Sequence, residues 1–204
     1  MFGLFNQLYD SIVPRRTFVY KDEIPKRVYD SIDWSNTSVA GSYALQKFTG
    51  DMSWEPHDVD LMVACSSKEE FIEESDKFQQ LVGAKLINQA WFDEKTPSED
   101  NELFHELVIG SRTYQVDDFS KRIQMVCLNN VDKFSEKKLS VAEILNVTTD
   151  IPSCVSYIVS NGQKMFSVPE KGCEILLTQR GLVDDICSSR LNKYVNRGYE
   201  FYKR

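Results

Sequence analysis

Two aspartates separated by one residue, Asp58 and Asp60, are the part of this 204-residue sequence best suited to chemistry. They open the run DVDLMVA, which has the apolar, β-branched composition of a strand. Side chains alternate between the two faces of a strand, so both carboxylates project to one side and repel each other. A divalent cation removes that repulsion, and Mg²⁺ commonly binds one or two carboxylates together with substrate phosphates. The pair therefore predicts a metal site that handles phosphate groups.

The dipeptide Gly41-Ser42 is the second candidate, at the turn between a predicted strand over 37–40 and a helix that includes YALQKF. Backbone N–H groups and the helix dipole at such a turn favour phosphate, and glycine lets the backbone come close. Each motif also has an ordinary structural interpretation: Gly-Ser is a common helix start, and D-x-D is common at solvated strand ends. Their order along the chain, with a tryptophan-containing loop between them, favours the functional interpretation.

This ordered set, GSYALQ followed by W-x-P-x-D-V-D, resembles the signature of the DNA polymerase beta-like nucleotidyltransferase superfamily. Within it, the sequence looks most like a group of little-characterised viral and fungal proteins. The resemblance implies two Mg²⁺ ions, with Mn²⁺ as an alternative, held by Asp58 and Asp60. It also implies nucleotidyl transfer from a nucleoside triphosphate to a hydroxyl acceptor, with release of pyrophosphate and with Ser42 on the terminal phosphates. The acceptor, whether nucleic acid, protein or small molecule, stays open.

A third carboxylate, on a neighbouring strand, belongs to the same family pattern. The resemblance assigns it to Asp150 in TTDIPSC, which follows IQMVCLNN and SVAEIL in the family order. Asp150 would complete the metal site and assist deprotonation of the acceptor hydroxyl. The pair Asp117-Asp118, after the apolar run YQV, is a competing candidate for this position.

The C-terminal stretch carries basic residues interleaved with aromatic ones, and it resembles the C-terminal helix of the same viral and fungal group. Arg190, Lys193 and Arg197 share one side of a predicted helix by their spacing. From this set we select Arg190 and Lys193 as nucleotide-binding candidates. A solvated face of an amphipathic helix gives the same pattern, as does a nucleic-acid contact that uses aromatic stacking.

The elements that must position these residues alternate between helix and strand. Predicted helices cover 22–32, 43–48, 66–82 and 140–145, and predicted strands cover 37–40, 58–64, 85–92, 104–109, 112–116, 123–128 and 148–159. Ser67 and Glu70 have the spacing of a capping box, and Gly110-Ser111 is a hairpin signal. The helix over 66–82 is expected to turn four apolar residues inward: Phe71, Phe78, Leu81 and Val82. The order predicts an α/β (α+β) fold of the nucleotidyltransferase type, with a mixed central sheet flanked by helices and a helical C-terminal segment.

Composition limits the remaining alternatives. We divide the chain into a nucleotidyltransferase-like catalytic core over 1–168, with N-terminal helices, and a helical segment over 169–204 packed on it. The net charge of −7 argues against general coating of nucleic acid. Five scattered cysteines indicate free thiols in a reducing compartment, so we expect a cytoplasmic protein without membrane contact. The rival to an enzyme is a catalytically inactive protein of this fold that serves as a binding or regulatory module, for example in a virus.

Overall fold

The fold of this chain is a mixed α/β arrangement, seen here in a computed structural model that describes residues 24–92, 107–130, 139–148, 155–168, 173, 175–176, 178–183 and 188–203. The helices are α2 (Lys26–Ser31), α3 (Gly41–Thr49), α4 (Lys68–Val82), α6 (Val141–Thr148) and α8 (Ser188–Val195). The strands are β1 (Thr37–Ala40), β2 (Asp58–Cys65), β3 (Lys85–Trp91), β4 (Val108–Gln115), β5 (Arg122–Asn129), β6 (Ser156–Ser160), β7 (Gln163–Ser167), β8 (Arg180–Val183) and β9 (Glu200–Lys203).

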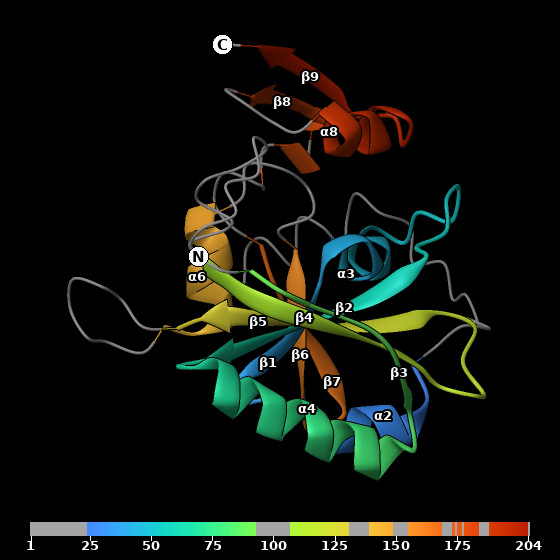
Figure 1. The fold of residues 1–204 in the computed structure, drawn as a ribbon. Helices are drawn as coiled ribbons and strands as arrows, with labels where there is room; N and C mark the ends of the chain where they lie inside the picture. The colour runs from blue at the N-terminus through green and yellow to red at the C-terminus, as the bar shows by residue number, and fades with distance from the viewer. Residues whose placement is uncertain are drawn as a thin grey trace.

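The centre of the fold is a seven-stranded sheet with the order β3-β4-β5-β2-β1-β6-β7. The pair β2 and β5 is parallel, and the other neighbouring pairs are antiparallel. Helices α2 and α4 cover one face, while α3 and α6 lie on the other (Figure 1). This confirms the predicted α/β class with a mixed central sheet flanked by helices.

Strand β2 shows how the sequence pattern selects these faces. Its odd-numbered positions, Val59, Leu61, Val63 and Cys65, are almost completely buried and join the cluster that contains Phe71 and Phe78 of α4. The even-numbered Ala64 belongs instead to a cluster with Val141 and Ile144 of α6. Because side chains alternate along a strand, Asp58 and Asp60 lie on the same face as Ala64.

Helix α4 begins and packs as its sequence predicts. The Ser67 hydroxyl accepts a hydrogen bond from the Glu70 backbone N–H, and the Glu70 carboxylate accepts one from the Ser66 N–H. Phe71, Phe78 and Val82 are buried, as predicted. The prediction that Leu81 also faces inward is wrong: its side chain is 60% exposed, because it falls outside the stripe that these three residues form.

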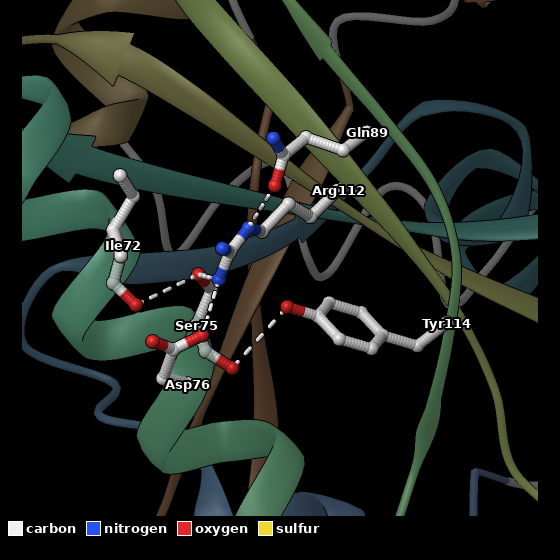
Figure 2. A network of polar contacts seen from close by, with 6 residues as sticks. All are labelled: Ile72, Ser75, Asp76, Gln89, Arg112 and Tyr114. Atoms are coloured by element: carbon white, nitrogen blue, oxygen red, sulfur yellow. Dashed lines mark hydrogen bonds and ion pairs between the residues drawn. The ribbon is translucent and has the colours of Figure 1, made fainter.

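A polar network fastens α4 to the sheet (Figure 2). The guanidinium of Arg112 on β4 donates to the Ser75 hydroxyl at 2.8 Å and to the Gln89 side chain at 2.9 Å, and it forms an ion pair with Asp76. The hydroxyl of Tyr114 donates to the Ser75 carbonyl at 3.3 Å. Burial raises the pKa of Tyr114, which keeps its hydroxyl protonated as a donor. On this face of the sheet, α4 is therefore held by hydrogen bonds and an ion pair between residues of the described chain.

The predicted turn at Gly110-Ser111 is wrong, because both residues lie inside the continuous strand β4. Gly110 is opposite Trp91 of β3, and a Cβ at this position would collide with the indole ring. The glycine thus makes room for a cross-strand aromatic ring instead of turning the chain. Residues 104–106, which begin the strand predicted over 104–109, lie outside the described residues.

The structure also differs from prediction after residue 147. Thr148, expected to open a strand, ends α6, and the described strand begins at Ser156. Asn161 and Gly162 then form a hairpin turn with positive φ angles of 51° and 74°, a local signal typical of such turns. The helix predicted in the C-terminal segment is present as α8, and it lies between β8 and β9, two parallel-paired strands that the sequence patterns do not predict.

Two further observations concern the predicted environment. Among the described residues, Cys65, Cys127 and Cys173 form no disulfide. No helix in the described part of the chain is long and apolar enough to cross a membrane.

Candidate active site

Asp58 and Asp60 occupy the first and third positions of β2, and both are partly exposed. The register places Asp60 beside Ala40 of β1 and Gln124 of β5, while Asp58 lies beside Arg122. The two carboxylates therefore share one face at one end of the central strand. Carboxylate oxygens on one face are a donor set that suits Mg²⁺ or Mn²⁺.

Gly41 brings the first turn of α3 close to the Asp60 carboxylate. It follows β1 with a positive φ of 70°, a conformation that glycine adopts without strain. A Cβ added at this position would collide with the Oδ2 atom of Asp60. The backbone at the helix start and the Asp60 carboxylate thus lie as close as a residue without a side chain permits.

The N-cap residue of α3 gives this helix no side-chain cap. That residue is Ala40, which has no polar side chain to accept hydrogen bonds from the first backbone N–H groups. Ser42 follows Gly41 and is 3% exposed. An uncapped helix start of this kind presents N–H groups and the positive end of the helix dipole to an anion.

Arg197, in the turn after α8, brings a positive charge to the same place. Its Nη1 donates to the Ser42 hydroxyl at 3.2 Å, although the two residues are 155 positions apart in the sequence. Burial lowers the pKa of Arg197, and the nearby negative charge of Asp58 opposes that shift. The contact therefore connects the C-terminal segment to the Gly-Ser turn and brings a positive charge near Asp58.

The loop between α3 and β2 supports this arginine. The guanidinium carbon of Arg197 lies 3.8 Å from the centre of the Trp54 ring. The indole N–H of Trp54 donates to Asp51 at 2.9 Å, and the Gln46 side chain donates to the Trp54 carbonyl at 2.5 Å. Burial alone would raise the pKa of Asp51, but hydrogen bonds from Ser53 and Trp54, together with the charge of Arg197, lower it.

The third carboxylate is not found among the described residues. No group of three His, Cys, Asp or Glu side chains able to hold a metal occurs in the described ranges. Asp150 lies outside them. Asp118 forms an ion pair with Arg27 of α2, which lowers the pKa of Asp118, first through the hydrogen bond and then through charge. Since α2 lies on the opposite face of the sheet from α3, the structure does not bring Asp117-Asp118 to Asp58 and Asp60.

The structure brings together Gly41, Ser42, Asp58 and Asp60 from the set that the sequence selects. Lys193 is an exposed residue of α8, and Arg190 belongs to the same helix, but its side chain is outside the described part. Arg197, which the sequence shows only as a member of the basic cluster, is the one that reaches Ser42. Its spacing from Arg190 and Lys193 indicates a shared face, and only the fold identifies which member contacts the site.

Comparisons with known proteins give structural similarities alone. No protein-family model and no curated protein sequence matches the chain. Solved structures that match include a tRNA-processing enzyme in an apo form (12% identity, TM-score 0.48, 80% of this chain and 38% of that one). Others are a CCA-adding enzyme with CTP (11%, 0.46, 78% and 36%) and a tRNA-processing enzyme complex (12%, 0.49, 82% and 40%).

The chain spans only 36–40% of the length of these three structures. Similarity at this level establishes neither a family nor an activity for the chain. The chemistry of the site therefore rests on its own residues.

Proposed function

We propose that this protein is a metal-dependent nucleotidyltransferase that transfers a nucleotidyl group from a nucleoside triphosphate to a hydroxyl acceptor and releases pyrophosphate. The observation that carries the proposal is the contact between the Gly41 backbone and the Asp60 carboxylate. It places an anion-attracting helix start directly beside two same-face carboxylates. A metal-bound triphosphate is a ligand that needs both features at once.

Asp58 and Asp60 would hold two Mg²⁺ ions, or Mn²⁺, because their oxygens share one face of β2. When bound, such ions offset the charge of the phosphates and favour ionisation of an attacking hydroxyl. The first turn of α3 binds the phosphate oxygens through its backbone N–H groups, and the Ser42 hydroxyl orients them. These groups are fixed before the substrate arrives, which is how a protein stabilises charge in phosphoryl transfer.

Asp150 completes the site in this proposal as the residue that accepts the proton of the acceptor hydroxyl. Strand β6 runs antiparallel to β1, with Val39 opposite Tyr157. The start of β6 therefore lies at the end of the sheet where β1 ends beside Asp60. Asp150 precedes β6 in the sequence, which supports its selection over Asp118 on the opposite face.

A pyrophosphate-release assay with each nucleoside triphosphate and a panel of nucleic-acid, protein and small-molecule acceptors tests the activity. Wild type is expected to turn over at least one combination, and the double variant Asp58→Ala/Asp60→Ala is expected to show none. Glu69→Ala/Glu73→Ala, which removes two exposed carboxylates from α4, serves as the matched control and should keep full activity. Equal turnover by the wild type and the Asp58/Asp60 variant contradicts the proposal.

A second candidate is a catalytically inactive protein that uses the same site for binding or regulation. The strands adjoining β2 favour it, since they place Ala40 and Gln124 beside Asp60, and Arg122 beside Asp58, without a further carboxylate at these positions. Calorimetric titration of wild type with Mg²⁺ and each nucleoside triphosphate separates the two candidates. Tight nucleotide binding without turnover of any acceptor supports the inactive protein, and turnover excludes it.

A further inference from the structure

We propose that Arg197 is the anion-binding residue of this site: its guanidinium, stacked on Trp54, binds the terminal phosphates of the nucleotide together with Ser42. The inference rests on the proposed function for the identity of the ligand. It assigns to the C-terminal segment a direct part in substrate binding.

The position of Arg197 is fixed from both sides. Tyr194 and Tyr199, which flank it, are 1% and 6% exposed and belong to the main buried cluster. The backbone N–H of Arg197 donates to the Tyr194 carbonyl at 3.0 Å. A side chain on such a turn loses little further freedom when it binds a ligand, which favours affinity.

The guanidinium forms no ion pair in the described part of the chain, although the charges of Asp51 and Asp58 act on it. Its side-chain hydrogen bonds go to neutral groups, the hydroxyls of Ser42 and Tyr194. Arg112 and Arg27, by contrast, pair with Asp76 and Asp118. A half-buried arginine that forms no ion pair within the described chain retains donors in the fork geometry that matches phosphate.

The Trp54 ring holds the charged guanidinium of Arg197 in place where the described chain gives it no ion pair. The ring lies 3.8 Å from the guanidinium carbon, a stacking distance, and Asp51 and Gln46 hold the tryptophan from two sides. Stacking leaves the edge of the guanidinium available for hydrogen bonds in its plane. That edge already reaches the Ser42 hydroxyl, which the proposed function places on the phosphates.

The neighbouring aspartates give the inference a distinctive consequence. A cation close to Asp58 opposes the binding of a divalent metal and favours the binding of a polyphosphate. Loss of the charge at Arg197 should therefore weaken polyphosphate binding and leave metal binding unchanged or slightly tighter. An arginine that only fastens the C-terminal segment to α3 would weaken both affinities together or neither.

The test uses the full chain, with Mn²⁺ alone and Mg²⁺-tripolyphosphate as separate probes in calorimetry. Arg197→Gln should weaken tripolyphosphate binding about 10- to 100-fold, because a charge-assisted pair of hydrogen bonds is lost. Its affinity for Mn²⁺ alone should equal that of wild type or be up to about fivefold tighter. Arg180→Gln, which removes an exposed arginine of the same segment, is the matched control and should change neither affinity.

Each outcome has a defined meaning. Unchanged tripolyphosphate binding by Arg197→Gln, with wild type active, overturns the inference and leaves the proposed function standing. A selective loss of tripolyphosphate binding in a protein that turns over no nucleotide supports the inference and contradicts the proposed function. Parallel loss of both affinities assigns Arg197 a structural role and overturns the inference.

A measurement on wild type covers the case in which Arg197→Gln does not fold. Phenylglyoxal modifies arginine side chains, and peptide mass spectrometry locates the modified positions. Mg²⁺-tripolyphosphate should protect Arg197 and leave the reactivity of Arg180 unchanged. Equal modification of Arg197 with and without tripolyphosphate overturns the inference.

Discussion

Helices α3 and α4 each follow a strand of the central sheet, β1 and β2. Their first turns differ in how the backbone N–H groups are capped. Helix α4 begins with side-chain caps, in which Ser67 accepts from the Glu70 N–H and Glu70 accepts from the Ser66 N–H. Helix α3 begins after Ala40, which has no side-chain cap, at a glycine with positive φ. Since β1 and β2 are antiparallel, the two starts lie at opposite ends of the sheet.

The faces that the two helices cover differ in the same way. On the α4 face, the buried Arg112 has an ion pair and hydrogen bonds to two side chains. On the α3 face, two aspartates lie beside an uncapped helix start and an arginine without an ion pair in the described chain. The polar groups on the α4 face hold the helix on the sheet, whereas those on the α3 face lie together as a site for a metal-bound anion requires.

Replacement of Gly41 by Ala should have the largest effect on function. The new Cβ would collide with the Asp60 carboxylate and force φ out of its present value, so metal-nucleotide binding and transfer should fall to background. The free energy of unfolding should fall by about 1–2 kcal/mol from the backbone conformation alone. Urea unfolding and Mn²⁺ titration measure the two effects.

Gly83→Ala is the matched control for this prediction. Gly83 ends α4 with a φ of 68°, and a Cβ there would meet nothing within 4 Å. This variant should lose comparable stability and keep full binding. A Gly41→Ala protein that binds Mn²⁺ and nucleotide as wild type does would remove the proposed distinction between the two helix starts.

Replacement of Arg112 by Met should have the largest effect on stability and none on the site. The change removes the donor that joins Ser75, Asp76 and Gln89, and the free energy of unfolding should fall by about 2–3 kcal/mol. The estimate is below that of a fully buried pair because the Asp76 side chain is 51% exposed. Urea unfolding gives the loss, and unchanged Mn²⁺ affinity at a temperature where the variant is folded completes the test.

Asp51→Asn should produce a small effect that depends on pH. The pKa of Asp51 is lowered in the fold, so its charge stabilises the protein above the ordinary aspartate pKa, and this contribution is lost as pH falls through the lowered value. The free energy of unfolding of wild type should therefore fall more than that of the variant between about pH 5 and about pH 3. Parallel pH profiles in urea unfolding would show that Asp51 does not hold Trp54 through its charge.

Much of the structure around α4, and the Asp58-Asp60 part of the candidate site, could be predicted from local sequence. Alternation in D-V-D places both carboxylates on one face, and the spacing of Ser67 and Glu70 predicts the cap. The hairpin at Asn161-Gly162 also carries a local signal, which the sequence prediction over 148–159 and beyond did not use. Patterns of this kind succeed because the residues that interact are neighbours along the chain.

The remaining features depend on partners that are distant in the sequence. Gly110-Ser111 has the composition of a turn, and only Trp91 on the adjacent strand explains why glycine is needed there. The contact between Arg197 and Ser42 joins residues that are 155 positions apart in the sequence. Helical spacing treats Arg190, Lys193 and Arg197 alike, so the residue that reaches the site emerges only from tertiary packing.

The central claim is that the Asp58-Asp60 pair and the start of α3 form one site for a metal-bound nucleoside triphosphate. Electron paramagnetic resonance titration of Mn²⁺, with and without a nucleoside triphosphate, tests it most directly on wild type and Asp58→Asn/Asp60→Asn. Wild type should bind Mn²⁺ more tightly when the nucleotide is present, and the double variant should lose binding under both conditions. Identical Mn²⁺ binding by the two proteins would contradict the account.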